Sequence, residues 1–432
     1  MAEVKPLRGL RYARNKTGDL SQIVTPPYDI ISKEAQARYY ARHPYNVIRL
    51  ELGQEQPTDD ALDNVYTRAA ATFAEWRSQG ILQQETAPCY YLYQQIFTHE
   101  GRQYTRTSLL ARVRLEPWEA RVVLPHENTL AKAKEDRLKL LRACNANFSP
   151  IMSLYEDPQG RIRRLLAPYA ASAEIRFTDE AGEEHRLQPI TDAQHIALIQ
   201  DFFAPRQLYI ADGHHRYTTA LNYRDEIYEQ RPSVDPQDGI NFVLMALIDL
   251  DDPGMLVLPT HRLLSGLSEQ ALSGLAQLNR YFTVQPLAGS TDRDILSALA
   301  RAGEQRSSLV VLDQQQAWLL TLNEEGEQEM ARSEHSAAWN RLDVAIAQRL
   351  ILERLLGLSA EDIAAGNVLR YTHNAEEAFQ AVRDREAQAA ILLNGTPLRQ
   401  ICDVAQADDR MPQKSTYIYP KLITGLVLNP LW

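Results

Sequence analysis

The segment Ile240–Leu250 constrains the fold more than any other part of the chain. It reads INFVLMALIDL, so nearly every side chain is apolar and the alternation of a half-exposed strand is missing. A strand with this pattern is usually covered on both faces by other layers. The segment therefore predicts an α/β or α+β fold with this strand in the middle of a sheet.

Other segments alternate between strand-like and helix-like patterns. Cys89–Phe97 and Arg106–Leu115 are rich in tyrosine and β-branched residues and predict a hairpin. Asp59–Gly80 has apolar residues at spacings of three and four and predicts a helix. Asn46–Leu52, NVIRLEL, resembles a short buried strand. Thr25–Asp29, TPPYD, is typical of a rigid structural turn rather than a site.

The length suggests how the chain divides. Its 432 residues allow two or three domains at roughly 100–200 residues each. Linkers are short, so the boundaries come from changes in pattern. We expect an N-terminal α/β region at 1–122, a motif-bearing core at 123–264, an inserted α/β lobe at 265–340, and a C-terminal helical region with a substrate segment at 341–432.

Composition argues against several classes of protein. The net charge of −10 counts against a general nucleic-acid binder. Cys89, Cys144 and Cys402 are too few and too scattered for a disulfide framework or a thiolate metal site. No apolar run approaches the ~18 residues of a membrane span, and the first residues lack the apolar core of a secretion signal. We expect a cytoplasmic enzyme or small-molecule binder that can form a homodimer.

The strongest chemical signal is the segment Tyr209–Leu221, YIADGHHRYTTAL. An apolar strand ends, an Asp-Gly turn follows, and a helix begins at the histidines. A helix N-terminus favours an anion, a glycine allows close approach of the backbone, and an arginine fork suits phosphate oxygens. The alternative is an aspartate that caps an ordinary helix. The candidate phosphate-binding residues are Gly213, His214, His215 and Arg216, which follow Asp212 in the turn.

A second signal is the Pro-His-Glu sequence within Leu124–Arg137. It falls in an irregular stretch between a strand and a helix, where catalytic groups are often found. Glu127 can act as a general base if it lies within hydrogen-bond reach of a substrate hydroxyl. The alternative is a solvated glutamate in a loop.

Two further segments carry polar groups that suit a substrate. Lys414, Ser415 and Thr416 supply a cation and two hydroxyls between two prolines, in a stretch that can hold a carboxylate or phosphate. The alternative is an ordinary extended tail. His261 and Arg262 follow an apolar strand, and the alternative there is an edge strand with a snorkelling arginine.

Together, ADGHHRYTTA, PHENTL…KEDRLKLL, LPTHRLL and MPQKSTYIYPKLITGLVLNP resemble a widespread family of uncharacterised prokaryotic proteins with an ADGHHRYxTA signature. More distantly, the chain is similar to the free serine kinases of the ParB/sulfiredoxin superfamily, which carry Pro-His-Glu, Asp-Gly-His-His-Arg and Pro-Lys-Thr-Thr in that order. The order is kept here, although Gln413 is inserted and Ser415 replaces a threonine. The kinases are shorter than this chain. They lack counterparts of Met1–Val122 and of much of Glu156–Gln207 and Ser265–Asn340.

The resemblance implies a ParB/sulfiredoxin-like nucleotide-binding core with large additions. It implies transfer of a phosphoryl group between ATP or ADP and a small hydroxy amino acid, serine first, or the reverse or hydrolytic reaction on phosphoserine. The Asp-Gly-His-His-Arg turn would bind the phosphates, and Asp212 would assist the transfer by holding Mg²⁺. The remaining implied residues are Glu127 as the base with His126 beside it, and Lys414, Ser415, Thr416, His261 and Arg262 for the substrate.

Two other functions stay open. A regulatory protein that binds nucleotide without turnover would have no need of Glu127. A metal-dependent phosphoesterase would use His214, His215 and His261 as ligands. Sulfiredoxin chemistry is set aside because His214 stands where that family has its cysteine.

Overall fold

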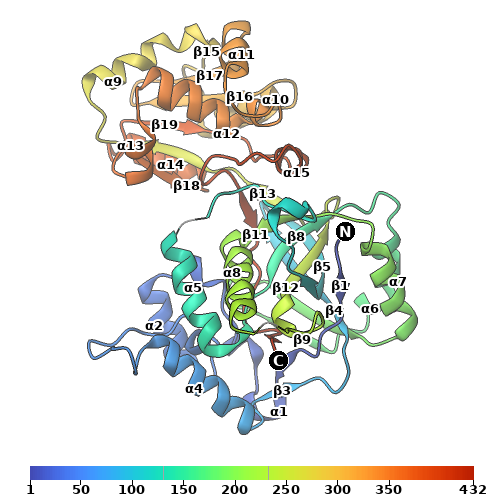
Figure 1. Ribbon diagram of the computed structural model, residues 1–432. Coiled ribbons are helices and arrows are strands. Elements are labelled where there is room, and N and C mark those ends of the chain that lie inside the picture. The colour runs from blue at the N-terminus through green and yellow to red at the C-terminus, as the bar shows by residue number, and fades with distance from the viewer. Residues whose placement is uncertain (130, 232) are drawn as a thin grey trace. The chain divides into compact units, whose positions relative to one another are not determined.

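The computed structural model describes residues 1–129, 131–231 and 233–432. Their contacts divide the chain into two compact units, which we call unit 1 and unit 2 (Figure 1). Unit 1 comprises Met1–Pro125, Thr129–Met255 and Pro420–Trp432, and unit 2 comprises His126–Asn128 and Leu256–Tyr419. These boundaries differ from those of the four predicted regions, whose independence stays a prediction.

The main sheet of unit 1 is mixed, and the predicted central strand lies in its middle. Among the described residues the strands follow the order β6-β11-β8-β12-β5-β4-β10-β9, with β1 also paired to β5. β12 (Phe242–Asp249) is buried along its whole length, between a parallel β8 (Ile151–Tyr155) and an antiparallel β5 (Arg102–Arg114). The prediction for this segment is confirmed, because both faces of the strand are covered.

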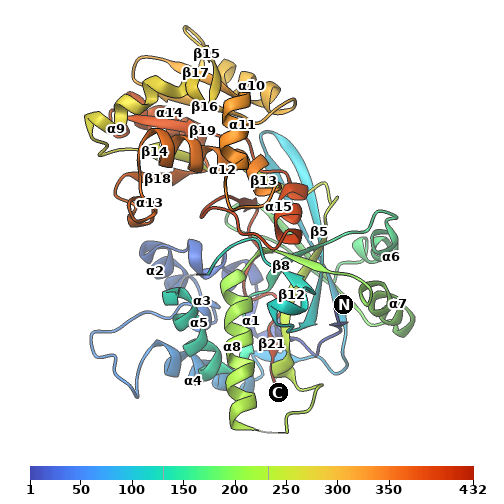
Figure 2. The same ribbon diagram turned by 45° about the horizontal axis from the view of Figure 1, so that its top comes forward.

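Four helices share one core on one face of this sheet. Buried side chains of α5, α6, α7 and α8, the helices seen beside the strands in Figures 1 and 2, belong to the same apolar cluster. Val243, Met245 and Leu247 of β12 share a core with Tyr217 of α8. The other strands are β1 (Val4–Lys5), β4 (Tyr90–His99), β6 (Val123–Leu124), β9 (Ile175–Thr178), β10 (Glu184–Ile190) and β11 (Leu208–Asp212). The covering helices are α5 (Ala131–Cys144), α6 (Arg161–Ala170), α7 (Ala193–Phe203) and α8 (His214–Gln230).

Unit 1 also contains several smaller elements. These are α1 (Arg14–Thr17), α2 (Lys33–Arg42), α3 (Ile48–Glu51) and α4 (Val65–Ser78), with the strand pairs β2 (Leu10–Tyr12) with β3 (Leu82–Gln84) and β7 (Ala146–Asn147) with β21 (Asn429–Pro430). The predicted helix at Asp59–Gly80 is confirmed but starts later, because Asn64 caps α4. The predicted hairpin is also confirmed, since β4 pairs with β5 along its length.

The prediction of a strand at Asn46–Leu52 is wrong. Asn46 accepts a hydrogen bond from the backbone N–H of Ile48 at 3.0 Å, and the chain turns into the short helix α3. An asparagine side chain that binds the backbone two residues later favours a turn over an extended strand. Apolar periodicity alone does not contain this information.

Unit 2 is built on a second sheet, with the order β15-β17-β16-β19-β14-β18 among the described residues. Leu309 and Val311 of β16 face one core, and Val310 and Leu312 face another, so both sides of the sheet are covered. Its strands are β14 (His261–Leu264), β15 (Phe282–Pro286), β16 (Ser308–Asp313), β17 (Ala317–Leu322), β18 (Leu369–Thr372) and β19 (Ala389–Leu392). A separate pair joins β13 (Leu256–Leu258) to β20 (Tyr417–Tyr419).

The helices of unit 2 pack on both sides of that sheet. α10 (Asp292–Gly303) and α14 (Ala375–Arg383) contribute to the core that contains Val310. α12 (Asp343–Ile346) and the π-helix η7 (Ala347–Leu355) contribute to the core that contains Leu309. The remaining helices are α9 (Glu269–Ser273), α11 (Glu324–Ala331), α13 (Ala360–Ala365) and α15 (Leu398–Gln406).

The structure therefore confirms a mixed α/β class for both units. Within the described ranges, no helix combines the length and hydrophobicity needed to cross a membrane.

Candidate functional site

The predicted strand–turn–helix is present in unit 1. β11 ends at Asp212, and α8 begins at His214. Gly213 between them has a φ of 100°, and a Cβ placed there would lie 2.9 Å from Nη2 of Arg216. The left-handed backbone at this position favours glycine over any residue with a Cβ. No side chain of the described residues caps α8 at this glycine, so Asp212 is not a helix cap.

The carboxylate of Asp212 is held by two cations. Lys421 Nζ donates a hydrogen bond to Oδ1 at 2.8 Å, and Arg216 Nη2 donates one to Oδ2 at 2.8 Å. Burial opposes ionisation of Asp212, but the charges of Lys421 and Arg216 outweigh it and hold its pKa well below the usual range. The three side chains carry a net charge of about +1 at neutral pH. They lie at the N-terminus of α8, where an anion is favoured.

Lys421 was not among the predicted site residues. Its backbone oxygen accepts a hydrogen bond from Gln95 Nε2 at 3.0 Å, and Gln95 Oε1 accepts one from the fully buried Arg106. The hairpin of β4 and β5 thus positions Lys421. Sequence reasoning chose Lys414 in the same segment, because nothing local distinguishes a lysine whose partner is 209 positions away.

Arg216 also connects the turn to the N-terminal part of unit 1. Its Nη1 donates a hydrogen bond to the backbone oxygen of Pro150 at 2.5 Å. The neighbouring Ser149 donates from Oγ to Oε1 of Glu51 at 3.0 Å, and Glu51 in turn pairs with Arg137. A continuous row of polar groups therefore runs from Asp212 to Arg137 inside unit 1.

His214 and His215 occupy the first turn of α8, as predicted. The side chain of His214 is buried, and that of His215 is half-buried. Their roles in binding phosphate stay predictions, as do those of Gly213 and Arg216.

His126 and Glu127 of the Pro-His-Glu motif belong to unit 2, and His126 contacts the C-terminal segment there. His126 Nε2 lies 3.5 Å from Oγ1 of Thr416 and 3.9 Å from Oε1 of Glu127. The backbone oxygen of His126 accepts a hydrogen bond from the N–H of Met411 at 2.8 Å. Glu127 remains 31 % exposed. Two predicted motifs that are 290 positions apart are thus in contact, while Leu130, at the end of PHENTL, lies outside the described residues.

The other predicted substrate residues differ in accessibility. Lys414 is exposed and has a φ of 56°, whereas Ser415 is buried and donates to the backbone oxygen of Pro412. His261 and Arg262 are both buried in β14. His261 Nδ1 accepts a hydrogen bond from Leu393 N–H at 3.2 Å. Burial, with the nearby charge of Arg262, lowers the pKa of His261 to about 4, so this ring is neutral at physiological pH.

The sequence predicts Mg²⁺ at Asp212, and the surroundings of this carboxylate bear on that prediction. Mg²⁺ is bound through carboxylate and phosphate oxygens. Both oxygens of Asp212 already accept hydrogen bonds from cations at 2.8 Å, and these cations would repel a metal ion. The arrangement fits an anion and does not fit Mg²⁺.

Comparison with solved structures finds only weak structural similarity. A conserved hypothetical protein from Pyrococcus furiosus shares 12% identity at a TM-score of 0.35, over 73% of this chain and 92% of that chain. A free serine kinase in complex with AMP shares 10% identity at a TM-score of 0.36, over 72% and 86%. SbnI with a C-terminal truncation, from Staphylococcus aureus, shares 11% identity at a TM-score of 0.35, over 74% and 87%. Scores this low do not establish a shared function.

Comparison with curated proteins finds no match. A family model described as "Protein of unknown function (DUF1015)" matches residues 4–345, which is most of the chain. The motifs that suggested a widespread prokaryotic family, PHENTL and ADGHHRYTTA, both fall inside this range. The protein therefore belongs to the DUF1015 family.

Proposed function

We propose that the protein is a phosphotransferase that moves a phosphoryl group between ATP or ADP and a small hydroxy amino acid, with free serine as the first candidate. The same groups serve the reverse or hydrolytic reaction on phosphoserine. The observation that carries the proposal is the convergence of Lys421 and Arg216 on Asp212 at the N-terminus of α8. Phosphoryl transfer depends mainly on positioning and charge neutralisation, which these groups supply.

In this proposal the phosphates of the nucleotide bind over the Asp-Gly-His-His-Arg turn. Arg216 offers a planar fork for phosphate oxygens, and Lys421 offers a point charge. Asp212 holds both cations in place before the ligand arrives, so that they need little reorganisation on binding. His214 and His215 place their backbone amides in the first turn of the helix.

The order of the motifs supports the remaining assignments. Glu127 is proposed as the general base that removes the proton of the substrate hydroxyl, with His126 beside it. Lys414, Ser415 and Thr416 are proposed to hold the amino acid, and the exposed Lys414 is the one suited to pair with its carboxylate. His261 and Arg262 stay predicted substrate residues. A ParB/sulfiredoxin-like core is part of the same proposal.

The test is a screen of ATP and ADP against free hydroxy amino acids, with phosphorus NMR of the products. We expect a phosphomonoester resonance with serine and its loss in Arg216→Ala. Phosphoserine incubated with and without ADP separates the reverse transfer from hydrolysis. If the nucleotide binds but no hydroxy amino acid yields a product, the protein is a nucleotide-binding regulator instead. If no nucleotide binds, the assignment of the turn is wrong.

A further inference from the structure

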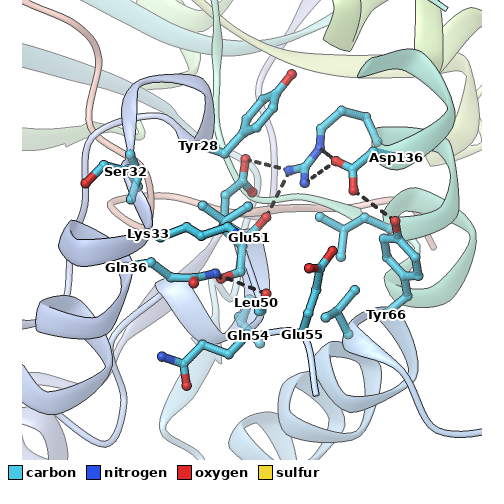
Figure 3. Close-up of a pocket in the computed structure, with 16 residues that line it drawn as sticks. Tyr28, Ser32, Lys33, Gln36, Leu50, Glu51, Gln54, Glu55, Tyr66 and Asp136 are labelled. Atoms are coloured by element: carbon cyan, nitrogen blue, oxygen red, sulfur yellow. Dashed lines mark hydrogen bonds and ion pairs between the residues drawn. The ribbon is translucent and has the colours of Figure 1, made fainter. Parts of the chain in front are cut away.

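Unit 1 contains a cavity of about 490 Å³ that is separate from the Asp-Gly-His-His-Arg turn. Its walls come from α2, α3, α4, α5 and the segment after α3, as Figure 3 shows. Neither Asp212 nor Arg216 is among the described residues that line it. The volume lies within the range of roughly 300–1,000 Å³ that is typical of small-molecule sites.

The floor of this cavity is a group of charges around the buried side chains of Arg137 and Glu51, and these charges satisfy one another. Arg137 Nε donates to Asp136 Oδ2 at 2.7 Å, and Nη1 donates to the backbone oxygen of Glu51 at 2.9 Å. Tyr66 donates its hydroxyl to Asp136 Oδ1 at 2.9 Å, and the ring of Tyr28 lies 3.9 Å from the guanidinium carbon of Arg137. Buried charges are costly, and an apolar floor of similar volume would stabilise the fold at least as well. The floor therefore suggests a polar ligand.

The rim carries two further charges of opposite sign. Lys33 and Glu55 both line the cavity and are exposed. Figure 3 shows Lys33 on one side and Tyr66 with Asp136 on the other, with Glu55 between them. Among the described residues neither Lys33 nor Glu55 has an ion-pair partner, so they do not neutralise each other. A ligand with one charge of each sign can pair with both.

We propose that this cavity binds a free α-amino acid, with its carboxylate paired to Lys33 and its ammonium group paired to Glu55. Lys33 is also the first residue of α2, and the dipole of that ten-residue helix favours the carboxylate at this end.

The charges of the wall favour a zwitterion over other ligands. The wall contains two cationic side chains and three carboxylates, so negative charge is in excess. The cations are Lys33 and Arg137, and the carboxylates are those of Glu51, Glu55 and Asp136. This excess of negative charge would repel a phosphate. An uncharged nucleoside would leave both Lys33 and Glu55 unpaired. The site goes beyond the proposed phosphoryl transfer and does not depend on it, since the turn supplies none of the lining described here.

The test is calorimetry on the full chain without nucleotide, using each of the common free amino acids. The tightest ligand is then compared with its decarboxylated amine and its deaminated acid, and each analogue should bind at least tenfold more weakly. Lys33→Ala and Glu55→Gln should each weaken binding at least tenfold. Both positions are exposed, so these variants should fold. Lys139→Ala, on an exposed part of α5 outside the cavity, is the matched control and should bind normally.

Arg216→Ala separates this inference from the proposed function. Amino-acid binding should persist in that variant, even where nucleotide binding is lost. If no amino acid binds the natural chain, or if binding survives both rim substitutions, the inference is wrong. If binding is lost in Arg216→Ala but kept in the rim variants, the amino acid occupies the turn, which overturns the cavity assignment and leaves the phosphotransferase proposal standing.

Discussion

Lys421 donates a hydrogen bond to Asp212 across 209 positions of the chain, with 2.8 Å between Nζ and Oδ1. The contact places a lysine from the C-terminal segment on the turn that begins α8. It leaves Asp212 ionised between two cations rather than free to cap the helix. The turn is therefore a cationic site with an internal counterion.

Removing Lys421 should weaken both the fold and the site. In Lys421→Ala the carboxylate of Asp212 keeps only Arg216, so its pKa should rise towards the usual range. We expect the free energy of unfolding to fall by about 1–3 kcal/mol, because Oδ1 of the half-buried Asp212 loses its hydrogen-bond donor. Urea denaturation checks this, with the exposed Lys139→Ala expected to change stability by less than about 0.5 kcal/mol. Equal stability in the two variants would show that the pair contributes nothing.

Arg216 should dominate nucleotide affinity. Arg216→Ala removes the fork above Gly213, and calorimetry should show ADP or ATP binding weakened at least tenfold. Arg216→Lys keeps the charge but loses the planar fork, so its affinity should be intermediate. Arg231→Ala, at the exposed far end of α8, is the control. Unchanged binding in a folded Arg216→Ala protein would remove the turn from the site.

Glu127 should be needed for turnover and not for nucleotide binding. Glu127→Gln keeps the shape of the side chain and removes its basicity. A general base typically contributes about 10²–10⁴-fold in rate, and kcat should fall by that factor while ADP affinity stays the same. Glu119→Gln, an exposed glutamate in a short turn, should keep full activity. A near-normal kcat in Glu127→Gln would mean that another group acts as the base.

Lys414 should act on the amino acid alone. Because its side chain is exposed, Lys414→Ala should leave the fold intact. We expect a higher KM for the hydroxy amino acid with nearly unchanged nucleotide affinity, the pattern of a lost substrate contact. The neighbouring Gln413→Ala, which is also exposed, serves as the control. Steady-state kinetics that do not distinguish the two variants would leave Lys414 as an ordinary surface residue.

Asp343 should make unit 2 less stable as the pH rises. Burial raises its pKa to about 7, even though hydrogen bonds from Ser307, Ser308 and Asn394 favour ionisation. In the unfolded chain an aspartate has a pKa of about 3.9. The folded state therefore holds its proton more tightly, and stability falls between about pH 4 and pH 7. Asp343→Asn cannot ionise, so its stability relative to the natural chain should increase across this range. Denaturation at several pH values checks this, and a constant difference would contradict it.

Sequence patterns predicted correctly those elements that are determined by neighbouring residues in the chain. The run at Ile240–Leu250, the hairpin of β4 and β5, and the turn before α8 each carry their own information on apolar content or turn residues. The helix α3 was not predicted, because its formation depends on a hydrogen bond that the backbone N–H of Ile48 donates to the side chain of Asn46. The role of Lys421 was missed because its partner is remote.

The cavity shows the same limit of sequence reasoning. Tyr28 belongs to TPPYD, which the sequence predicts to be a structural turn, and it does lie in a short 3₁₀ turn. The same residue also lines the cavity, together with Tyr66 and Arg137 from distant helices. Each residue has an ordinary local explanation, and only the tertiary structure brings their polar groups to one space. A pattern of spacing within one segment cannot reveal such a site.

Unit 1 contains residues from both sides of unit 2 in the chain, and this has a consequence for its synthesis. At ribosomal rates of about 5–20 residues per second, Lys421 follows Asp212 by about 10–40 s. All of Leu256–Tyr419 is translated in that interval. The nascent chain therefore carries the carboxylate of Asp212 without one of its two cations until Pro420–Trp432 has left the ribosome. The ion pairs of the Asp-Gly-His-His-Arg turn are therefore completed only after most of unit 2 is available to fold, and a chain that stops anywhere within Leu256–Tyr419 never acquires the pair with Lys421.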